Sequence, residues 1–134
     1  SDIISKQLRM LRENKQVNNI SFFKNFTPEN YIKLISNSEC LVGNSSSGIR
    51  ESSFLSIPVV NIGSRQKNRE RGFNVIDVEY NKNQIFNAIL KQMKNRKIKK
   101  SFIYGDGFAY KKIITLLNKI LKKKVSVEKQ LNYL

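Results

Sequence analysis

Apolar residues along this chain fall into two patterns, helical spacing and short continuous runs. Helical spacing over residues 3–11 predicts a first helix. A second helix is predicted from Pro28, because proline suits the first turn of a helix. Further helices are predicted over residues 49–54, 84–93 and 113–120.

Short apolar runs predict strands between these helices. They lie at residues 20–23, 39–42, 57–62 and 74–78. Alternating strands and helices are typical of a parallel sheet covered by right-handed crossover helices. The expected fold class is therefore α/β, with a Rossmann-like, doubly wound parallel sheet. Such a half-domain normally starts with a strand, and none precedes the first predicted helix, so we expect its first strand to be missing.

The length and composition predict one folded unit. The chain has 134 residues, of which 40% are hydrophobic, enough for one packed core. We expect a domain over residues 1–122 followed by a tail over residues 123–134. No apolar run approaches the roughly 20 residues that a membrane-spanning helix needs, and the start of the sequence lacks the pattern of a signal peptide. A cytoplasmic location without a membrane partner is therefore expected.

Charge and residue types exclude several kinds of chemistry. Lys and Arg number 25 against 10 Asp and Glu, which gives a net charge of +15 without any His. The densest positive stretches, residues 91–100 and 119–124, lack interleaved aromatic residues, so a solvated face is favoured over a nucleic-acid site. With no His, Cys40 has no activating base and is predicted to be a buried small residue. We expect no metal, no cofactor and no Ser-His-Asp triad.

A loop of small polar residues, 43–48, follows the predicted strand 39–42. Open α/β sheets bind ligands beyond the carboxyl ends of their strands. The loop's N–H groups and the hydroxyls of Ser45, Ser46 and Ser47 could therefore donate to a phosphate. The alternative is a plain serine-rich turn and helix cap.

Two charged features accompany that loop. Glu51 follows Ser47 by about one helical turn, which places a carboxylate within reach of a vicinal diol such as a ribose. The loop over residues 63–72 follows the next strand, and guanidinium groups in it suit bidentate phosphate contact. Its arginines are Arg65, Arg69 and Arg71. Two neighbouring strand-end loops are thus expected to face one diphosphate.

Four motifs in a fixed order carry a family resemblance. They are Gly-Asn-Ser-Ser-Ser-Gly-Ile-Arg-Glu at 43–51, Ile-Pro-Val-Val-Asn-Ile-Gly-Ser-Arg-Gln at 57–66, Arg69-Glu70 with Asn-Val-Ile at 74–76, and Tyr-Gly-Asp-Gly at 104–107. Together they resemble the C-terminal domain of UDP-N-acetylglucosamine 2-epimerases, and are most similar to the hydrolysing branch of sialic-acid-type sugar synthesis. The resemblance runs from Ser1 to about Ile120.

The resemblance implies the C-terminal half of a two-domain, glycosyltransferase-B-type fold. It implies an enzyme that converts UDP-N-acetylglucosamine and water into N-acetylmannosamine and UDP. In that family the missing N-terminal half and the segment joining the halves supply the acid and base groups, so we expect no catalytic residue here and no activity from this chain alone. The implied partners are UDP or UDP-N-acetylglucosamine and that N-terminal domain, with a homo-oligomer left open. The Lys-rich, Asn-rich composition suggests a bacterial source.

The resemblance also assigns roles position by position. Ser45 and Ser46 would hold the diphosphate, Glu51 would bind the ribose hydroxyls, and Arg65 would contact the phosphate region. The residues implied to shape the loop are Gly43, Asn44, Ser47 and Gly48.

Other hypotheses stay open. One is the donor-binding C-terminal domain of a UDP-sugar glycosyltransferase, which residues 63–66 and 104–107 disfavour. Another is a non-catalytic nucleotide- or polyanion-binding module. For the polyanion version, binding would fall steeply with salt and would be unaffected by Glu51→Ala. The segment 104–107 is either a turn and helix cap or a part that closes the site.

Overall fold

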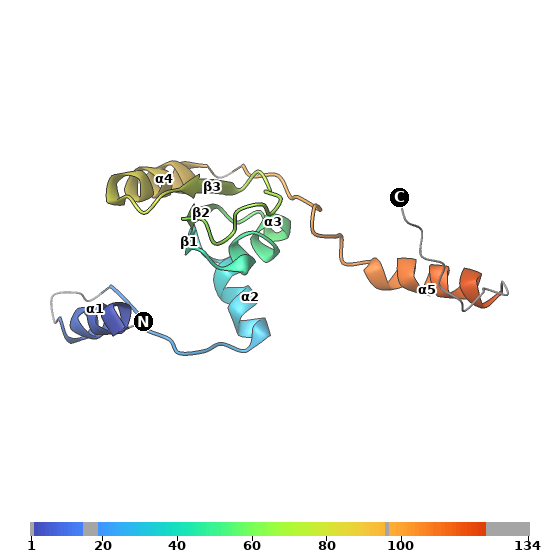
Figure 1. Cartoon of the computed structure of the whole chain (residues 1–134), viewed down its shortest axis with the longest axis horizontal. Helices are drawn as coiled ribbons and strands as arrows, with labels where there is room; N and C mark the ends of the chain where they lie inside the picture. The colour runs from blue at the N-terminus through green and yellow to red at the C-terminus, as the bar shows by residue number, and fades with distance from the viewer. Residues whose placement is uncertain (1, 15–18, 96, 123–134) are drawn as a thin grey trace, which may run out of the picture. The chain divides into compact units, whose positions relative to one another are not determined.

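The computed structural model describes residues 2–14, 19–95 and 97–122, coloured in Figure 1. The chain forms two compact units, Ser1–Leu34 and Ile35–Leu134. The elements in chain order are α1 (Asp2–Glu13), α2 (Pro28–Ser36), β1 (Leu41–Gly43), the 3-10 helix η1 (Ser46–Gly48), α3 (Glu51–Leu55), β2 (Val59–Ile62), β3 (Val75–Val78), α4 (Lys82–Lys94) and α5 (Ala109–Leu121). The predicted tail, residues 123–134, lies outside the described residues.

The run over residues 20–23, predicted as a strand, is not one in the structure. Its aromatic side chains make local contacts: Arg12 lies 5.1 Å over the Phe22 ring, and the ring centroids of Phe23 and Phe26 are 4.9 Å apart. A strand requires a neighbour to complete its hydrogen bonds. The described strands all lie in the other unit. The prediction was wrong because an apolar run guarantees neither burial nor a pairing partner, and Ile20 and Phe23 are exposed.

The sheet is parallel, as predicted, with the strand order β1-β2-β3. Leu41 pairs with Val59, and Val60 pairs with Ile76. β2 begins later than the predicted run because Pro58 has no N–H to donate to a ladder. The structure is thus an α/β fold with a small Rossmann-like sheet.

The core lies between the sheet and its helices. Its buried apolar residues are Ile35, Ile49, Ile57, Val59, Val60 and Ala88. α4 packs against β2 and β3 (Figure 1). Asn81 begins it, because its side-chain oxygen accepts from the N–H groups of Asn83 and Gln84. Its buried residues are Ala88 and Gln92, and the Gln92 amide donates to the carbonyls of Val59 and Asn74, each at 2.7 Å.

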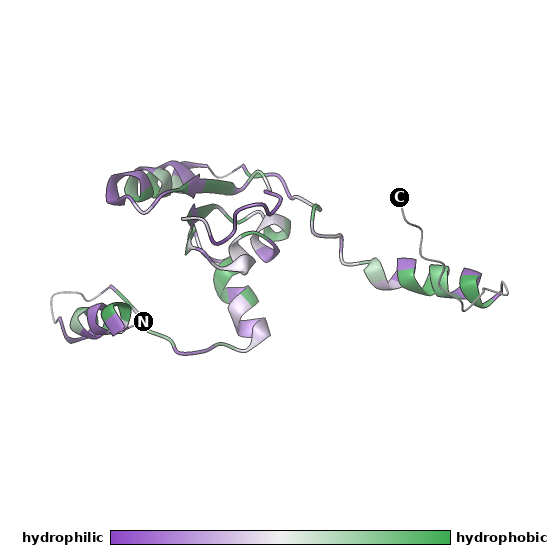
Figure 2. Cartoon of the chain, in the orientation of Figure 1, coloured by the Kyte–Doolittle hydropathy of each residue, from purple (hydrophilic) through white to green (hydrophobic). Residues whose placement is uncertain are grey.

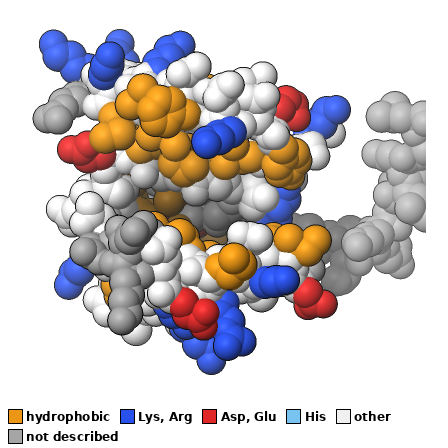
Figure 3. Space-filling view, turned by 90° about the vertical axis from the view of Figure 1, so that its left-hand side faces the viewer, with side chains coloured by type: hydrophobic (Ala, Val, Ile, Leu, Met, Phe, Trp, Pro, Cys, Tyr) orange, Lys and Arg blue, Asp and Glu red, His pale blue; other side chains and the backbone are white. Residues whose placement is uncertain are grey.

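The outer surfaces of the helices carry many apolar side chains. Ile85 and Ile89 of α4 are half-buried, whereas Met93 is exposed. α1 and α5 alternate apolar and polar residues, as Figure 2 shows, and neither has a buried residue. Figure 3 shows apolar side chains standing among Lys and Arg on one face. None of the described helices combines the length and apolarity needed to cross a membrane.

Candidate functional site

The loop after β1 is a tight turn capped by its own serine. Ser45 is extended and is the N-cap of η1, and its side-chain oxygen accepts from the Ser47 N–H at 3.4 Å. The Gly48 N–H donates to the Ser45 carbonyl at 3.1 Å. Ser46 is the first residue of η1, and the hydroxyls of Ser45 and Ser47 lie 3.3 Å apart. The predicted turn and cap is present, and it gathers serine hydroxyls at the carboxyl end of β1.

This loop contains two glycines, one with an unusual backbone conformation and one that lies close to the sheet. Gly43 has a φ of +148°, a backbone conformation that residues with a side chain rarely adopt. A Cβ at Gly48 would lie 3.2 Å from Val59 Cγ1, so only glycine lets the turn rest directly on β2 without displacement. A hollow of about 170 Å³ lies between β1 and this loop.

The second strand-end loop contacts the first, as predicted. Arg65 Nη1 donates to the Asn44 carbonyl at 3.3 Å, and Gln66 Nε2 donates to the same oxygen at 2.8 Å. Arg65 is exposed, whereas Gln66 is only 2% exposed. Arg65 and the serine hydroxyls therefore lie at neighbouring positions of one sheet edge.

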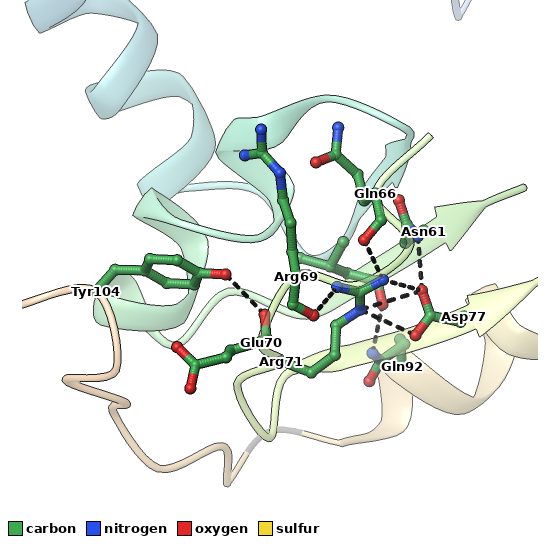
Figure 4. Close-up of polar contacts among 9 residues, drawn as sticks. Asn61, Gln66, Arg69, Glu70, Arg71, Asp77, Gln92 and Tyr104 are labelled. Carbon is green, nitrogen blue, oxygen red and sulfur yellow. Dashed lines mark hydrogen bonds and ion pairs between the residues drawn. The ribbon is translucent and has the colours of Figure 1, made fainter. Parts of the chain in front are cut away.

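Arg71, one of the arginines considered for phosphate contact, is bound to other residues of the chain. Its Nε donates to Asp77 Oδ2 at 3.0 Å, and its Nη2 donates to the Gln66 carbonyl at 2.7 Å. Asn61 Nδ2 also donates to Asp77 Oδ1, at 2.6 Å. Figure 4 shows this cluster, with the guanidinium of Arg69 turned away from Asp77. Of the loop's arginines, Arg71 is committed to the protein itself.

Asp77 stays ionised because of these partners. Burial alone would raise the pKa of its carboxyl, but the hydrogen bonds from Arg71 and Asn61, together with the charge of Arg71, lower the pKa below the usual 3.8. A carboxyl whose pKa is lower in the folded state stabilises the fold above its unfolded-state pKa. That stabilisation is lost as the pH falls through the folded-state pKa.

We expect the Arg71–Asp77 pair to make the fold acid-sensitive. The free energy of unfolding of the wild type should exceed that of Asp77→Asn above about pH 4. The difference should stay below about 1 kcal/mol, since Asp77 is about half exposed and solvent screens the pair. It should shrink toward zero as the pH approaches 2. Urea unfolding of both proteins across this range measures it, and a difference that grows with acid would contradict the assignment.

Glu51 lies apart from these contacts. It is the exposed first residue of α3, and its carboxylate makes no hydrogen bond to any of the described residues.

Cys40 is half-buried rather than buried. Burial raises the pKa of its thiol, against a smaller opposite effect of a backbone hydrogen bond at Val60, which does not favour a nucleophilic thiolate.

The segment 104–107 contributes both a turn and a contact with the loop over residues 63–72, called the arginine loop below. Asp106 Oδ1 accepts from the Phe108 N–H at 2.9 Å, just before α5. The Tyr104 hydroxyl donates to the Glu70 carbonyl at 2.8 Å (Figure 4).

Among the described residues, no three His, Cys, Asp or Glu side chains gather as a metal site would require.

Sequence reasoning missed Gln66, Asn61 and Asp77. Asn61 and Asp77 are paired residues on the neighbouring strands β2 and β3, so their side chains lie side by side on the same face of the sheet. Gln66 lies in a polar loop, where a glutamine is ordinarily exposed. The one available signal was that Asn61 is a polar residue within the otherwise apolar run 57–62, which was predicted to be a strand.

Comparison with known proteins identifies similar sequences. Residues 2–118 match the profile of the family described as UDP-N-acetylglucosamine 2-epimerase. A UDP-N,N'-diacetylbacillosamine 2-epimerase (hydrolyzing) of Legionella pneumophila is 39% identical over 75% of this chain and 27% of its own length. Polysialic acid biosynthesis protein P7 of Escherichia coli is 38% identical over 66% of this chain and 22% of its own length.

A third relative covers a shorter stretch. The UDP-N-acetylglucosamine 2-epimerase of Neisseria meningitidis is 39% identical over 46% of this chain and 16% of its own length. The chain therefore spans only 16% to 27% of the length of these relatives.

Proposed function

The chain belongs to the UDP-N-acetylglucosamine 2-epimerase family, and on that premise we propose that it is the UDP-binding part of a hydrolysing 2-epimerase. The proposed reaction converts UDP-N-acetylglucosamine and water into N-acetylmannosamine and UDP. Loss of the C2 proton and departure of UDP from C1 give a glycal, to which water then adds. We assign the acid and base groups to parts of the whole protein outside these 134 residues, so this chain alone binds nucleotide without turnover.

The three-stranded sheet would belong to the C-terminal half of a glycosyltransferase-B-type fold. The family membership and the small share of each relative that the chain covers support this. In this proposal another part of the whole protein supplies a further strand, and the nucleotide lies between the two halves. The partner of this chain is then that second half, together with UDP or the UDP-sugar.

The observation that carries the proposal is the meeting of two strand-end loops at the Asn44 carbonyl, which accepts from both Arg65 and Gln66. This arrangement brings the serine hydroxyls of one loop and a guanidinium of the other to the edge where α/β sheets bind ligands. Hydroxyl donors and a guanidinium together suit a diphosphate.

We also propose a role for each of these residues and for Glu51. Ser45 and Ser46 donate to the diphosphate, and Arg65 contacts the phosphate oxygens. Glu51 accepts from the ribose hydroxyls, for which its exposed carboxylate is available. These roles are part of the proposal, together with loop shaping by Gly43, Asn44, Ser47 and Gly48.

Calorimetric titration with UDP at moderate salt tests the proposal. We expect binding by the wild-type chain, and a loss of about 1.5–3 kcal/mol of binding free energy in Glu51→Ala and in Arg65→Ala, since each removes hydrogen bonds to a charged group. Arg9 and Glu13 form an exposed pair in α1, and Arg9→Ala and Glu13→Ala make the same changes of charge elsewhere. Both control variants should bind UDP like the wild type.

The calorimetric result separates the competing functions. If the matched controls weaken binding as much as Arg65→Ala and Glu51→Ala, net charge alone attracts UDP and the assigned site is wrong. If wild-type binding is absent at millimolar UDP, this chain does not form the proposed nucleotide site by itself. A steep fall with salt that Glu51→Ala leaves unchanged supports polyanion binding instead.

UDP-N,N'-diacetylbacillosamine is a second candidate substrate. The Legionella relative, named for that UDP-sugar, matches 75% of this chain at 39% identity. Both candidates are UDP-linked acetamido sugars, so the proposed diphosphate and ribose contacts are the same for each. Turnover assays of the whole protein with the two UDP-sugars in parallel decide between them, since the preferred substrate has the larger kcat/KM.

A further inference from the structure

Gln66 is a buried amide in a loop whose neighbouring side chains are exposed. It is 2% exposed, between exposed Arg65 and Lys67. A buried polar side chain is generally held by hydrogen bonds. Gln66 Nε2 donates to the Asn44 carbonyl at 2.8 Å, which joins the loop after β2 to the loop after β1. Because a carbonyl can only accept, this contact also fixes which amide atom faces Asn44.

The backbone of Gln66 is itself held to the sheet. Its carbonyl accepts from Arg71 Nη2 at 2.7 Å, and Arg71 Nε donates to Asp77 Oδ2 at 3.0 Å. Asp77 also accepts from Asn61, its register partner on β2. Figure 4 shows this connection from the strands through Arg71 to Gln66. The backbone of Gln66 is therefore linked to β2 and β3 by contacts that do not involve the loop over residues 43–48.

The Asn44 carbonyl has two donors, Gln66 Nε2 and Arg65 Nη1. Two donors use both of its lone pairs and restrict rotation of the peptide that leads into Ser45. Arg65 is an exposed, long side chain that would move to contact a phosphate, whereas Gln66 is enclosed. Gln66 Oε1 has no hydrogen-bond partner among the described residues, so the hold of this side chain on the loop depends on the Nε2 contact.

We propose that Gln66 is a positioning residue, which holds the Gly43–Gly48 loop in its binding-competent form before the nucleotide arrives. The inference rests on the proposed function, because the loop is the proposed diphosphate site. A loop ordered in the free protein loses less conformational entropy on binding, so the affinity for UDP increases. Gln66 acts through Asn44 and need not touch the ligand.

Amide hydrogen exchange of the free chain tests the proposal without a ligand. We expect Gln66→Met to raise exchange of the amides of residues 44–50 about three- to tenfold, as loss of one hydrogen bond predicts. The matched control is Gln92→Met, which changes an equally buried glutamine and removes two hydrogen bonds in the core. Under native conditions it should leave exchange of residues 44–50 within twofold of the wild type.

Titration with UDP is the second measurement. Gln66→Met should lower the affinity at least fivefold at a temperature where every variant is folded, and Gln92→Met should lower it less than twofold. If Gln66→Met does not fold, Asp77→Ala removes the anchor of Arg71 instead and should raise loop exchange about threefold, above the range allowed for the control. Unchanged loop exchange in whichever of these two variants is measured overturns the proposal.

The outcomes also separate this inference from the proposed function. Faster loop exchange in Gln66→Met, without UDP binding by the wild type, supports the positioning of the loop and counts against the nucleotide site in this chain. Equal acceleration by Gln66→Met and Gln92→Met means general instability and overturns the positioning role. UDP binding that Gln66→Met leaves intact overturns it as well, while the nucleotide site stands.

Discussion

Replacement of Ile49 by alanine is expected to lower the free energy of unfolding by about 2–5 kcal/mol. Ile49 follows η1 directly, its side chain is 0% exposed, and its N–H donates to the Ser46 carbonyl at 3.0 Å. Removing buried carbons loses their transfer free energy and leaves a cavity, because a packed interior relaxes only in part. Urea unfolding followed by circular dichroism measures the change.

The matched control for this substitution is Ile114→Ala in α5. Ile114 is 53% exposed, so the same change of side chain should alter stability by less than about 0.5 kcal/mol. Similar losses at the two positions would mean that Ile49 is not packed as the structure has it. Since Ile49 lies at the end of the serine turn, its variant should also weaken UDP binding if the nucleotide site is correct.

The strands of the sheet were predicted well from the sequence, whereas the further strand predicted at residues 20–23 is absent from the structure. Apolar runs at residues 39–42, 57–62 and 74–78 each contain most of a strand. β2 is largely buried, as is typical of a strand that reads as a continuous apolar segment, whereas β1 and β3 are mostly half-buried. The run over residues 20–23 has the same composition without a neighbouring strand, and composition alone cannot reveal that difference. The parallel arrangement followed from the alternation of elements, and this prediction was confirmed.

The proximity of the two strand-end loops could be predicted because it follows from topology. Loops after neighbouring parallel strands meet at one sheet edge, and Arg65 and Asn44 are in contact there. The binding roles of Ser45, Ser46 and Glu51 stay predictions. Their chemistry is general to turns and helix starts, so a titration rather than the geometry alone has to test it.

The contacts within the arginine loop could not be predicted from sequence. Arg71 was one of three arginines considered for phosphate contact, and in the structure its guanidinium donates to Asp77, six residues later on β3. The order of residues does not distinguish Arg71 from Arg65, because only the folded structure shows which of the two guanidinium groups reaches Asp77 on β3. Gln66 carries no apolar pattern, so its burial emerges only from the folded loop.

Replacement of Gly72 by alanine is expected to lower the free energy of unfolding by about 3 kcal/mol, at the upper end for an overpacked interior. A Cβ on this buried glycine would clash with Asn74 Oδ1 and lie 2.8 Å from the Cβ of Ser53. Asn74 cannot easily rotate away, because its Nδ2 donates to the Ser52 hydroxyl at 3.0 Å and to the Ile57 carbonyl at 2.8 Å. Relief of the clash must therefore break a buried hydrogen bond or shift α3.

Gly48→Ala is the matched control for Gly72→Ala. Its Cβ would lie 3.2 Å from Val59 Cγ1, a contact that a small movement of one side chain relieves, so a loss of about 1 kcal/mol is expected. Both substitutions restrict the unfolded chain alike, so that contribution cancels in the comparison. Urea unfolding of the two variants measures the difference. Equal losses would show that the Asn74 side chain moves away easily despite its two hydrogen bonds.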